Sequence, residues 1–482
     1  MRQRARRSSV LFLALGAFAL ASCRSAGPAA PPPPPSAPPA TRDARPNVVF
    51  IVADDLDWSG IEHMPALKAL FTHSGTTFTN AYVTTSVCCP SRASFLTGQY
   101  VHNHEVLDNR FPLGGFRKFF DSGREKSTIA TWMQEAGYRT GLVGKYLNFY
   151  PQRVKNPTYV PPGWDYWRAV FFPESYLEYQ INENGKVETY GATPDEYLTD
   201  MLRNKALEFF SHAKNDPRPF FLYLAPLAPH APAEPAARHV NALPGIQAPR
   251  PPSFNEEDVS DKPEWVRRLP LMTEETTVRT DEWYRRRAQS MLAVDEMLTT
   301  LVDSLHDSGR LENTYLIFTS DNGFQLGPHR MDHGKGDGYE ESIRVPLIVR
   351  GPGVPAGARV DAHVLNIDVA PTIAELAGAR AADFVDGRSF VPFLRGTKPR
   401  TWRKDFLIEH WTDEEDGIPN YLGLHTTEHV YLEYPSGERE LYDLKRDPYQ
   451  MQSLHASAPA LAQKLAARLA SLKDCKAAGC RD

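Results

Sequence analysis

The sequence predicts an α/β fold: a large, mainly parallel sheet sandwiched by helices, followed by a small C-terminal antiparallel sheet with one helix. First, short apolar runs alternate with amphipathic helical patterns over most of the chain, as in parallel sheets whose strands are joined by helices. Second, these apolar runs end in polar or glycine-rich segments. Third, the pattern changes near residue 395, after which short strand-like runs replace the alternation.

The N-terminus is predicted to be an export signal followed by a tether. Residues 1–23 combine a basic start, an apolar run and the sequence Leu20-Ala21-Ser22-Cys23, which resembles a bacterial lipoprotein box. That resemblance implies lipidation of Cys23, and ordinary cleavage after Ala21 is the alternative. Residues 24–46 are mostly proline, alanine and small or polar residues, a composition expected to form an extended tether. We therefore expect an exported lipoprotein of the cell envelope, on the periplasmic or cell-surface side, that meets the membrane only through Cys23.

Five apolar runs are predicted to form strands of the main sheet. Residues 47–52 are apolar at nearly every position, as in strands that are buried on both faces, and the runs at 141–144, 220–224, 315–318 and 345–349 are similar. In chain order they lead into Asp54-Asp55, Lys145, Pro229-His230, Asp321-Asn322 and Gly351-Pro352-Gly353. Because α/β sheets bind ligands outside the carboxyl ends of their strands, the polar residues of these segments are expected to share one site.

Helices are predicted between these strands at residues 128–136, 195–213 and 284–305. In the second, the apolar residues recur at helical spacing on one face. Residues 231–283 are rich in proline, glutamate and arginine with little periodicity, which indicates a long surface excursion.

The C-terminal region is predicted to contain strands at residues 405–409, 429–433 and 440–444, with a hairpin turn at 435–438. A helix is expected at 458–473, with Ser457 as its N-cap and Pro459 in its first turn. Cys475 and Cys480 are expected to form a disulfide, since the protein is predicted to be exported. We therefore divide the folded part into a catalytic domain at residues 47–394 and a C-terminal subdomain at 395–482.

The charge of the chain argues against one class of partner. The formal net charge is −5 at pH 7, which does not suit a general nucleic-acid-binding protein. After the export signal, no apolar run is long enough to span a bilayer.

The signature segment, residues 86–98, carries the functional prediction. It reads Cys88-Cys89-Pro90-Ser91-Arg92 and continues to Leu96-Thr97-Gly98, and it resembles the signature of the type I sulfatases in the alkaline phosphatase superfamily. The resemblance implies that a formylglycine-generating enzyme oxidises Cys88 to formylglycine (3-oxoalanine), the nucleophile once hydrated. It also implies that Arg92 holds the aldehyde hydrate. The alternative is a buried cysteine pair at the start of a helix.

A metal site is predicted from the carboxylates at two strand ends. Asp54, Asp55, Asp321 and Asn322 offer only oxygen donors, which favour a hard ion, calcium before magnesium. The resemblance implies calcium at these four residues, with a further oxygen from formylglycine at Cys88. Taken alone, each of these segments is equally typical of an ordinary turn.

Three further residues are predicted to act on the substrate. Lys145 follows a strand in Gly144-Lys145, and Lys335 precedes Arg344-Val345-Pro346; both match the family's lysines and would hold an anionic ester. His230 lies in Pro229-His230-Ala231-Pro232, which matches the family's general acid, a role suited to histidine.

The sequence departs from many sulfatases at one position. These enzymes carry a histidine two residues after the motif lysine, as the base that eliminates sulfate, whereas this chain has Leu147. Asn148, His102 and His104 are the alternatives for that role. The segments 144–148 and 102–104 look most like those of the N-acetylglucosamine-6-sulfatase and heparan endosulfatase branch.

The resemblance implies hydrolysis of a sulfate ester by a calcium-bound formylglycine hydrate, which releases sulfate and an alcohol. The expected substrate is a sulfated sugar, N-acetylglucosamine 6-sulfate or a glycosaminoglycan, or an aryl sulfate. One alternative is a phosphonate monoester or phosphodiester hydrolase of the same superfamily. The other is a non-enzymatic surface lipoprotein that kept the fold as a binding module.

Overall fold

The computed structural model describes residues 43–481, apart from 153, 215 and 414–416. The predicted export signal, Cys23 and most of the tether lie outside these residues and stay predictions. The described residues belong to one compact unit, so the division at residue 394 also stays a prediction. Within the described part of the chain, no helix is both long and apolar enough to cross a membrane.

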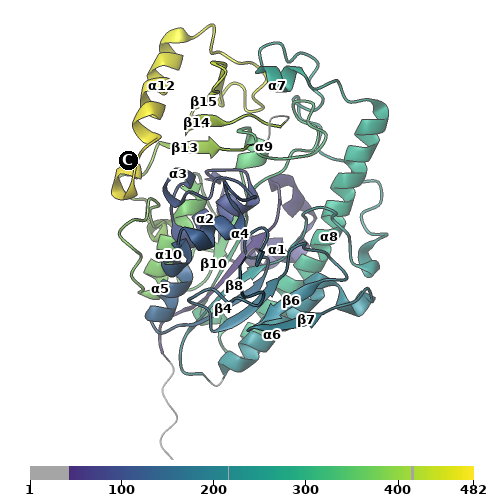
Figure 1. The fold of residues 1–482 in the computed structure, drawn as a ribbon, viewed down its shortest axis with the longest axis vertical. Coiled ribbons are helices and arrows are strands. Elements are labelled where there is room, and N and C mark those ends of the chain that lie inside the picture. The colour runs from purple at the N-terminus through teal and green to yellow at the C-terminus, as the bar shows by residue number, and fades with distance from the viewer. Residues whose placement is uncertain (1–42, 153, 215, 414–416, 482) are drawn as a thin grey trace, which may run out of the picture. The chain divides into compact units, whose positions relative to one another are not determined.

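A ten-stranded sheet forms the centre of the molecule (Figure 1). The strands around its middle run parallel, with β1 between β9 and β8, and β4 between β8 and β5. The full order is β11 (Ala358–Val360), β2 (Thr76–Phe78), β10 (Leu347–Arg350), β9 (Thr314–Ser320), β1 (Asn47–Ala53), β8 (Phe220–Ala225), β4 (Arg139–Gly144), β5 (Tyr166–Val170), β6 (Gln180–Glu183) and β7 (Lys186–Thr189).

Helices cover both faces of this sheet, which explains the apolar run in β1. Val48, Phe50 and Val52 face one core, together with α2 (Cys88–Thr97), α5 (Ile129–Glu135) and α10 (Val369–Ala377). Val49 and Ile51 face the opposite core, together with α6 (Leu198–Lys214) and α8 (Glu274–Asp307). Because successive side chains of a strand point to opposite faces, a strand buried on both sides is apolar throughout. The predicted α/β fold is confirmed.

Shorter elements complete this part of the chain. β3 (Ala81–Tyr82) pairs with β12 (Val364–Leu365) in a separate two-stranded sheet. The short helices are α1 (Pro65–Leu67), α3 (Val101–His104), α4 (Gly115–Asp121), α7 (Glu264–Arg267), α9 (Glu340–Ile343) and α11 (Val391–Leu394).

One of the five predicted strands runs antiparallel to both of its neighbours. β10 runs antiparallel to β9, so Gly351-Pro352-Gly353, which follows β10, is at the opposite edge of the sheet from Asp321. The start of β10 faces the predicted site instead. Local apolarity identified the strand but carries no information about its direction.

The predicted helices exist with shifted ends. The helix expected at 284–305 is α8, which begins at Glu274 because the Thr273 side chain caps it by accepting from the Thr276 amide. The helix expected at 195–213 begins at Leu198, because Pro194–Glu196 forms a 3-10 turn. The surface excursion therefore contains α7 and the first turns of α8.

The C-terminal sheet is four-stranded and antiparallel, one strand more than the sequence predicted. Its strands are β13 (Asp405–His410), β14 (Tyr421–Thr426), β15 (His429–Glu433) and β16 (Arg439–Asp443), and α12 (Pro459–Leu472) packs against it. The predicted Ser457 N-cap is wrong, because Ala458 occupies that position and no side chain caps the helix. The C-terminal sheet is hydrogen-bonded to the part of the chain that surrounds the ten-stranded sheet. The Glu409 amide donates to the carbonyl of Thr84, and the Tyr421 hydroxyl donates to the carbonyl of Gly336.

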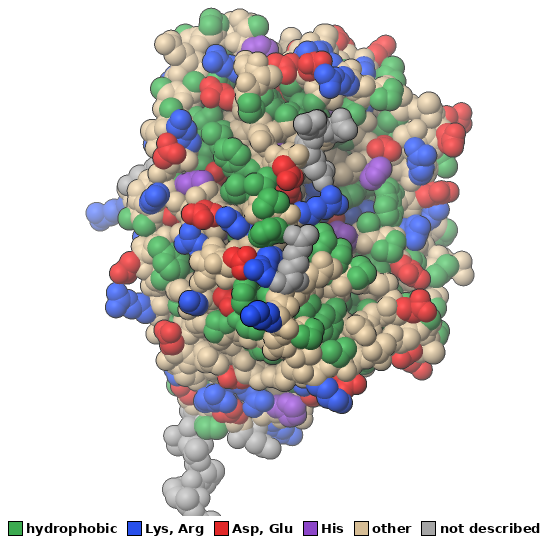
Figure 2. Space-filling view, viewed as in Figure 1, with side chains coloured by type: hydrophobic (Ala, Val, Ile, Leu, Met, Phe, Trp, Pro, Cys, Tyr) green, Lys and Arg blue, Asp and Glu red, His purple; other side chains and the backbone are tan. Residues whose placement is uncertain are grey.

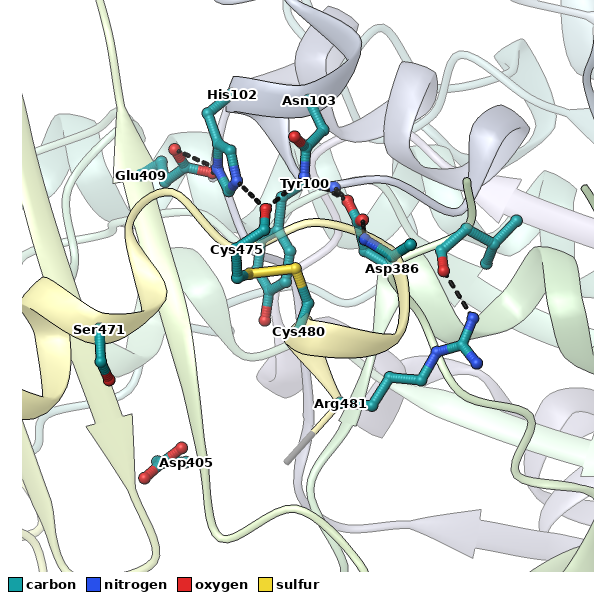
Figure 3. The surroundings of a disulfide bond; sticks show 12 residues. Tyr100, His102, Asn103, Asp386, Asp405, Glu409, Ser471, Cys475, Cys480 and Arg481 are labelled. Carbon is teal, nitrogen blue, oxygen red and sulfur yellow. Dashed lines mark hydrogen bonds and ion pairs between the residues drawn. A yellow bond between two sulfur atoms is a disulfide. The ribbon is translucent and has the colours of Figure 1, made fainter. Parts of the chain in front are cut away.

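Cys475 and Cys480 form the predicted disulfide and close a loop against the residues that follow α2 (Figure 3). The Cys475 carbonyl accepts from His102 Nε2 at 2.9 Å and from Asn103 Nδ2 at 2.8 Å, and the Ala477 amide donates to Asp386. We call residues 475–480 the C-terminal clasp. It ties the end of the chain to α3, which directly follows the signature helix.

The clasp predicts a pH-dependent stability. His102 Nδ1 lies 2.9 Å from the Glu409 carboxylate, and its Nε2 faces the Cys475 carbonyl, so both ring nitrogens must donate and the ring is cationic. Burial opposes this charge, but Glu409 raises the pKa of His102 to about 9. A raised pKa stabilises the fold fully below pH 6.5 and progressively less up to pH 9.

We therefore expect the wild type to lose up to about 3 kcal/mol more stability than His102→Gln between pH 6.5 and 9. Denaturant unfolding at several pH values measures the difference. Comparison with the variant removes the contributions of groups that titrate in both proteins. Parallel pH curves for the two proteins would show that His102 is not charged in the fold.

Candidate active site

The sheet brings the predicted carboxylates together. Asp54 and Asp55 directly follow β1, and Asp321 and Asn322 directly follow β9, its parallel neighbour. The Asp55 amide donates to Asp321 Oδ1 at 3.0 Å, and Asn322 Nδ2 donates to Asp55 Oδ1 at 2.8 Å. All four side chains are buried. We call these four residues the acidic cluster.

The signature segment delivers Cys88 to this cluster. Cys88 is the first residue of α2, and its Sγ lies 3.6 Å from Asp54 Oδ1 and 3.7 Å from Asp55 Oδ1. Lys335 Nζ lies 2.6 Å from the same sulfur and also contacts Asp55. Burial raises the pKa of the Cys88 thiol well above its usual value, and Lys145 and Lys335 only partly oppose this effect. The thiol is therefore not a ready nucleophile in its unmodified form.

Two more cations line the other side of the cluster. Arg92 lies one turn along α2 from Cys88, and its Nε donates to Asp321 Oδ2 at 2.7 Å. Lys145, directly after β4, places Nζ 2.6 Å from Asp54 Oδ2. Burial alone would raise the pKa of Asp54, but Lys145 and other cations lower it well below its usual range. Three cations thus face the carboxylates around the Cys88 sulfur.

The cluster suits a hard cation. Asp54, Asp55 and Asp321 each place an oxygen within 4.8 Å of the others. Burial and the neighbouring Asp54 raise the pKa of Asp321 to about 6, although Arg92 and Lys335 oppose the shift. Asn322 Oδ1 is buried without a hydrogen-bond partner among the described residues. An oxygen-only donor set with an orphaned amide oxygen fits calcium, with magnesium second.

His230 lies at the exposed side of the cluster. It follows β8, and its Nε2 is 3.8 Å from Asp55 Oδ2, while its Nδ1 is 2.8 Å from the Ala231 carbonyl. Its side chain is 30% exposed, so this ring can meet a ligand that enters from solvent. The structure therefore brings all the predicted site residues into one place.

The histidines considered as replacements for a base at Leu147 point elsewhere. His104 Nδ1 accepts from the Val106 amide, so its Nε2 donates to Ser94 Oγ at 3.0 Å, and burial lowers its pKa to about 3. His102 binds Glu409 and the Cys475 carbonyl of the clasp. Asn148 is buried, and its Oδ1 has no partner within the described chain.

Arg287 is a site-supporting residue that the sequence analysis missed. From α8, its Nη2 contacts the Asp55 carbonyl and lies 3.0 Å from Asp57 Oδ1, and its Nη1 is 3.4 Å from the Pro229 carbonyl. The guanidinium also stacks 4.1 Å from the ring centroid of Phe324. One buried cation thus joins the loops that carry Asp55, His230 and Asn322. An arginine within an amphipathic helix gives no sequence signal for this role.

The surface has no broad basic face on the side that is visible. Figure 2 shows lysine and arginine side chains interspersed with aspartate and glutamate. The cations gathered at the acidic cluster are therefore a local feature of the buried site.

Comparisons with known proteins match both parts of the chain. Residues 46–379 match the family described as Sulfatase, and residues 331–475 match the one described as N-sulphoglucosamine sulphohydrolase, C-terminal. The chain is 36% identical to N-acetylglucosamine-6-sulfatase of Capra hircus over 477 residues, which cover 91% of this chain and 85% of the relative. It is 37% identical to a putative extracellular sulfatase Sulf-1 homolog of Caenorhabditis elegans, over 76% of this chain and 53% of the relative.

The fold also resembles a solved structure. The structure of BT4656 in complex with its substrate D-glucosamine-2-N,6-O-disulfate superposes with a TM-score of 0.76 at 24% identity. The match covers 88% of this chain and 97% of that chain.

Proposed function

The chain belongs to the sulfatase family and is a sulfuric ester hydrolase, and we propose that it removes sulfate from position 6 of a glucosamine-type sugar or glycan through an oxidised Cys88. The observation that carries this proposal is the Cys88 sulfur between two carboxylates and beside Lys335. The substrate class is proposed from the name of the goat relative, an N-acetylglucosamine-6-sulfatase.

Two further groups would complete the proposed chemistry. Formylglycine at position 88 would supply an aldehyde hydrate, whose hydroxyl would act as the nucleophile toward sulfur. Calcium would be held by Asp54, Asp55, Asp321 and Asn322, and it would offset the negative charge of the sulfate group.

The chain's own cations orient the anion. Lys145, Lys335 and Arg92 surround position 88 with fixed positive charge in a buried site, where electrostatic interactions are strong. Because Arg92 is bound to Asp321 and Lys145 to Asp54, these cations are already in place before substrate arrives. The positioned charges favour a transition state in which charge accumulates on the sulfate oxygens.

His230 is proposed to protonate the departing alcohol oxygen. It reaches the cluster from the solvent-exposed side, which is where the rest of the sugar would extend. We expect His230→Ala to lower turnover of a sugar sulfate by about 10²–10⁴-fold. The loss should be far smaller for an aryl sulfate, because an acidic phenol leaves without protonation.

The comparison of the two substrates tests this role. His239→Ala is a matched control, because His239 lies nearby in sequence but its Nε2 pairs with Glu296. Equal losses on both substrates in His230→Ala would contradict a general-acid role and indicate a binding role.

The proposed location is outside the cytoplasm. The name of the worm relative, an extracellular sulfatase homolog, and the disulfide in the clasp support export. Lipidation of Cys23 stays a prediction from the sequence.

Two measurements test the function. Mass spectrometry of the peptide that contains residue 88 should show the conversion of a thiol to an aldehyde. Release of sulfate from N-acetylglucosamine 6-sulfate should greatly exceed hydrolysis of a phosphodiester and a phosphonate monoester. A preference for either phosphorus ester would overturn the proposed reaction in favour of the related hydrolases.

A further inference from the structure

A large cavity lies beside the active site, between the main domain and the C-terminal sheet. Its volume is about 770 Å³, within the range of small-molecule sites. Its lining comes from the segment after β1, the segment after β9, α9, the end of β14 and the residues near Tyr449. The acidic cluster and Cys88 do not line it.

The cavity and the acidic cluster share two loops. After β1, Asp54 and Asp55 belong to the cluster, whereas Asp57 and Trp58 line the cavity. After β9, Asp321 belongs to the cluster and Phe324 lines the cavity. The cavity is therefore a separate space that adjoins the catalytic residues through the loops that position them.

The cavity wall contains polar groups of two kinds. His363 and His425 are 4% and 1% exposed, and Nδ1 of each is closed off from solvent, so these rings form part of the wall and do not bind a ligand. Glu62 and Glu341 also line the cavity, and burial raises the pKa of the Glu341 carboxyl. The carboxylates are therefore the hydrogen-bond acceptors that a ligand in the cavity can reach.

The cavity is not built for an anion. Its two arginines are engaged, because Arg250 pairs with Asp281 at 2.6 Å and Arg344 Nη2 donates to the Thr79 carbonyl at 2.6 Å. Glu62, Glu340 and Glu341 add negative charge. A sulfate group would meet carboxylates here without an unpaired arginine to balance it.

The apolar lining is aromatic. The Arg344 guanidinium lies 5.3 Å from the ring centroid of Trp58, and Tyr449 is 43% exposed. Phe324 also lines the cavity and lies two residues after Asn322 in the chain. Aromatic rings beside carboxylates suit a ligand with C–H faces and many hydroxyl groups.

We propose that this cavity binds an uncharged saccharide unit, as an accessory glycan site separate from the sulfate site. Hydroxyl groups of the sugar donate to the carboxylates of Glu62 and Glu341, which line the cavity, and its apolar face packs on the aromatic rings. This inference rests on the proposed function for the source of the saccharide, namely an unsulfated unit of the glycan substrate or product.

The test uses an unsulfated N-acetylglucosamine trimer and the full protein. Saturation-transfer NMR should show saturable binding of the trimer that is unchanged by an excess of inorganic sulfate, since sulfate is an anion for the catalytic pocket. Tyr449→Ala should weaken this binding by about fivefold or more. Thr427→Trp, a substitution at an exposed lining residue, should block it.

Leu271→Ala is the matched control, because Leu271 is 49% exposed and lies outside the cavity lining; it should bind the trimer as the wild type does. Thermal unfolding shows whether each variant is folded. Displacement of the trimer by sulfate, equal binding by wild type, Tyr449→Ala and Thr427→Trp, or no binding at all would overturn the proposal. Trimer binding is measured without turnover, so a failed sulfatase assay and a failed binding assay are distinguishable.

Discussion

Cys88→Ala is expected to lower sulfate-ester turnover by about 10⁴-fold or more, because it removes the proposed nucleophile while leaving the charged pocket in place. The sulfur lies between Asp54 and Asp55 in a fully buried position. The only other free cysteine in the described chain, Cys89, packs in the apolar core and does not face the acidic cluster. Alanine is used instead of serine because a serine at position 88 would carry a hydroxyl group that can itself be oxidised.

Cys89→Ala is the matched control. Cys89 is the next residue, equally buried and chemically identical, and burial raises its pKa to about 12. Its replacement should cost about 1 kcal/mol of stability and change turnover by less than about threefold. If Cys88→Ala kept more than about a hundredth of wild-type turnover, the nucleophile would be another group.

The sequence predicted the central strands because burial on both faces leaves a readable apolar run. Other strands escaped prediction because they lack such a run. β7, at one edge of the ten-stranded sheet, is largely exposed, and β14, an inner strand of the C-terminal sheet, is interrupted by Gly423 and His425. Strand direction also escaped, since the apolar side chains of β10 pack in the same way whichever way the strand runs.

The sequence predicted those residues of the candidate site that lie in short motifs. Carboxylate pairs at strand ends, the cysteine of the signature segment and the lysines around it could be placed because adjacent parallel strands end at one edge. Arg287 could not be predicted, because its role depends on carbonyls from two distant loops. The cavity likewise depends on the packing of the C-terminal sheet against the main domain, which no local pattern encodes.

Removal of a divalent cation is the second large effect that we expect. Chelation should abolish turnover and destabilise the fold, and calcium should restore both more effectively than magnesium. A cation present at 100 times its dissociation constant stabilises the fold by about 2.7 kcal/mol, so thermal unfolding reports its loss without an activity assay. The physical reason is the acidic cluster, where burial and Asp54 raise the pKa of Asp321 and Asn322 Oδ1 has no hydrogen-bond partner in the part of the chain that the structure describes.

Asp321→Asn tests the binding of the cation independently of the other features of the site. It removes one carboxylate charge from the cluster while Arg92 keeps Asp54 within 3.6 Å, and we expect calcium to bind about 10²-fold more weakly. Asp386→Asn is the control, since this buried carboxyl serves the clasp and not the cluster; it should lower stability but leave the calcium response intact. Equal unfolding temperatures with calcium and with chelator in the wild type would mean that the carboxylates are neutralised by Arg92, Lys145 and Lys335 alone. The three cations and three carboxylates balance in number, so this measurement decides whether sulfate meets a metal or only the side chains of the protein.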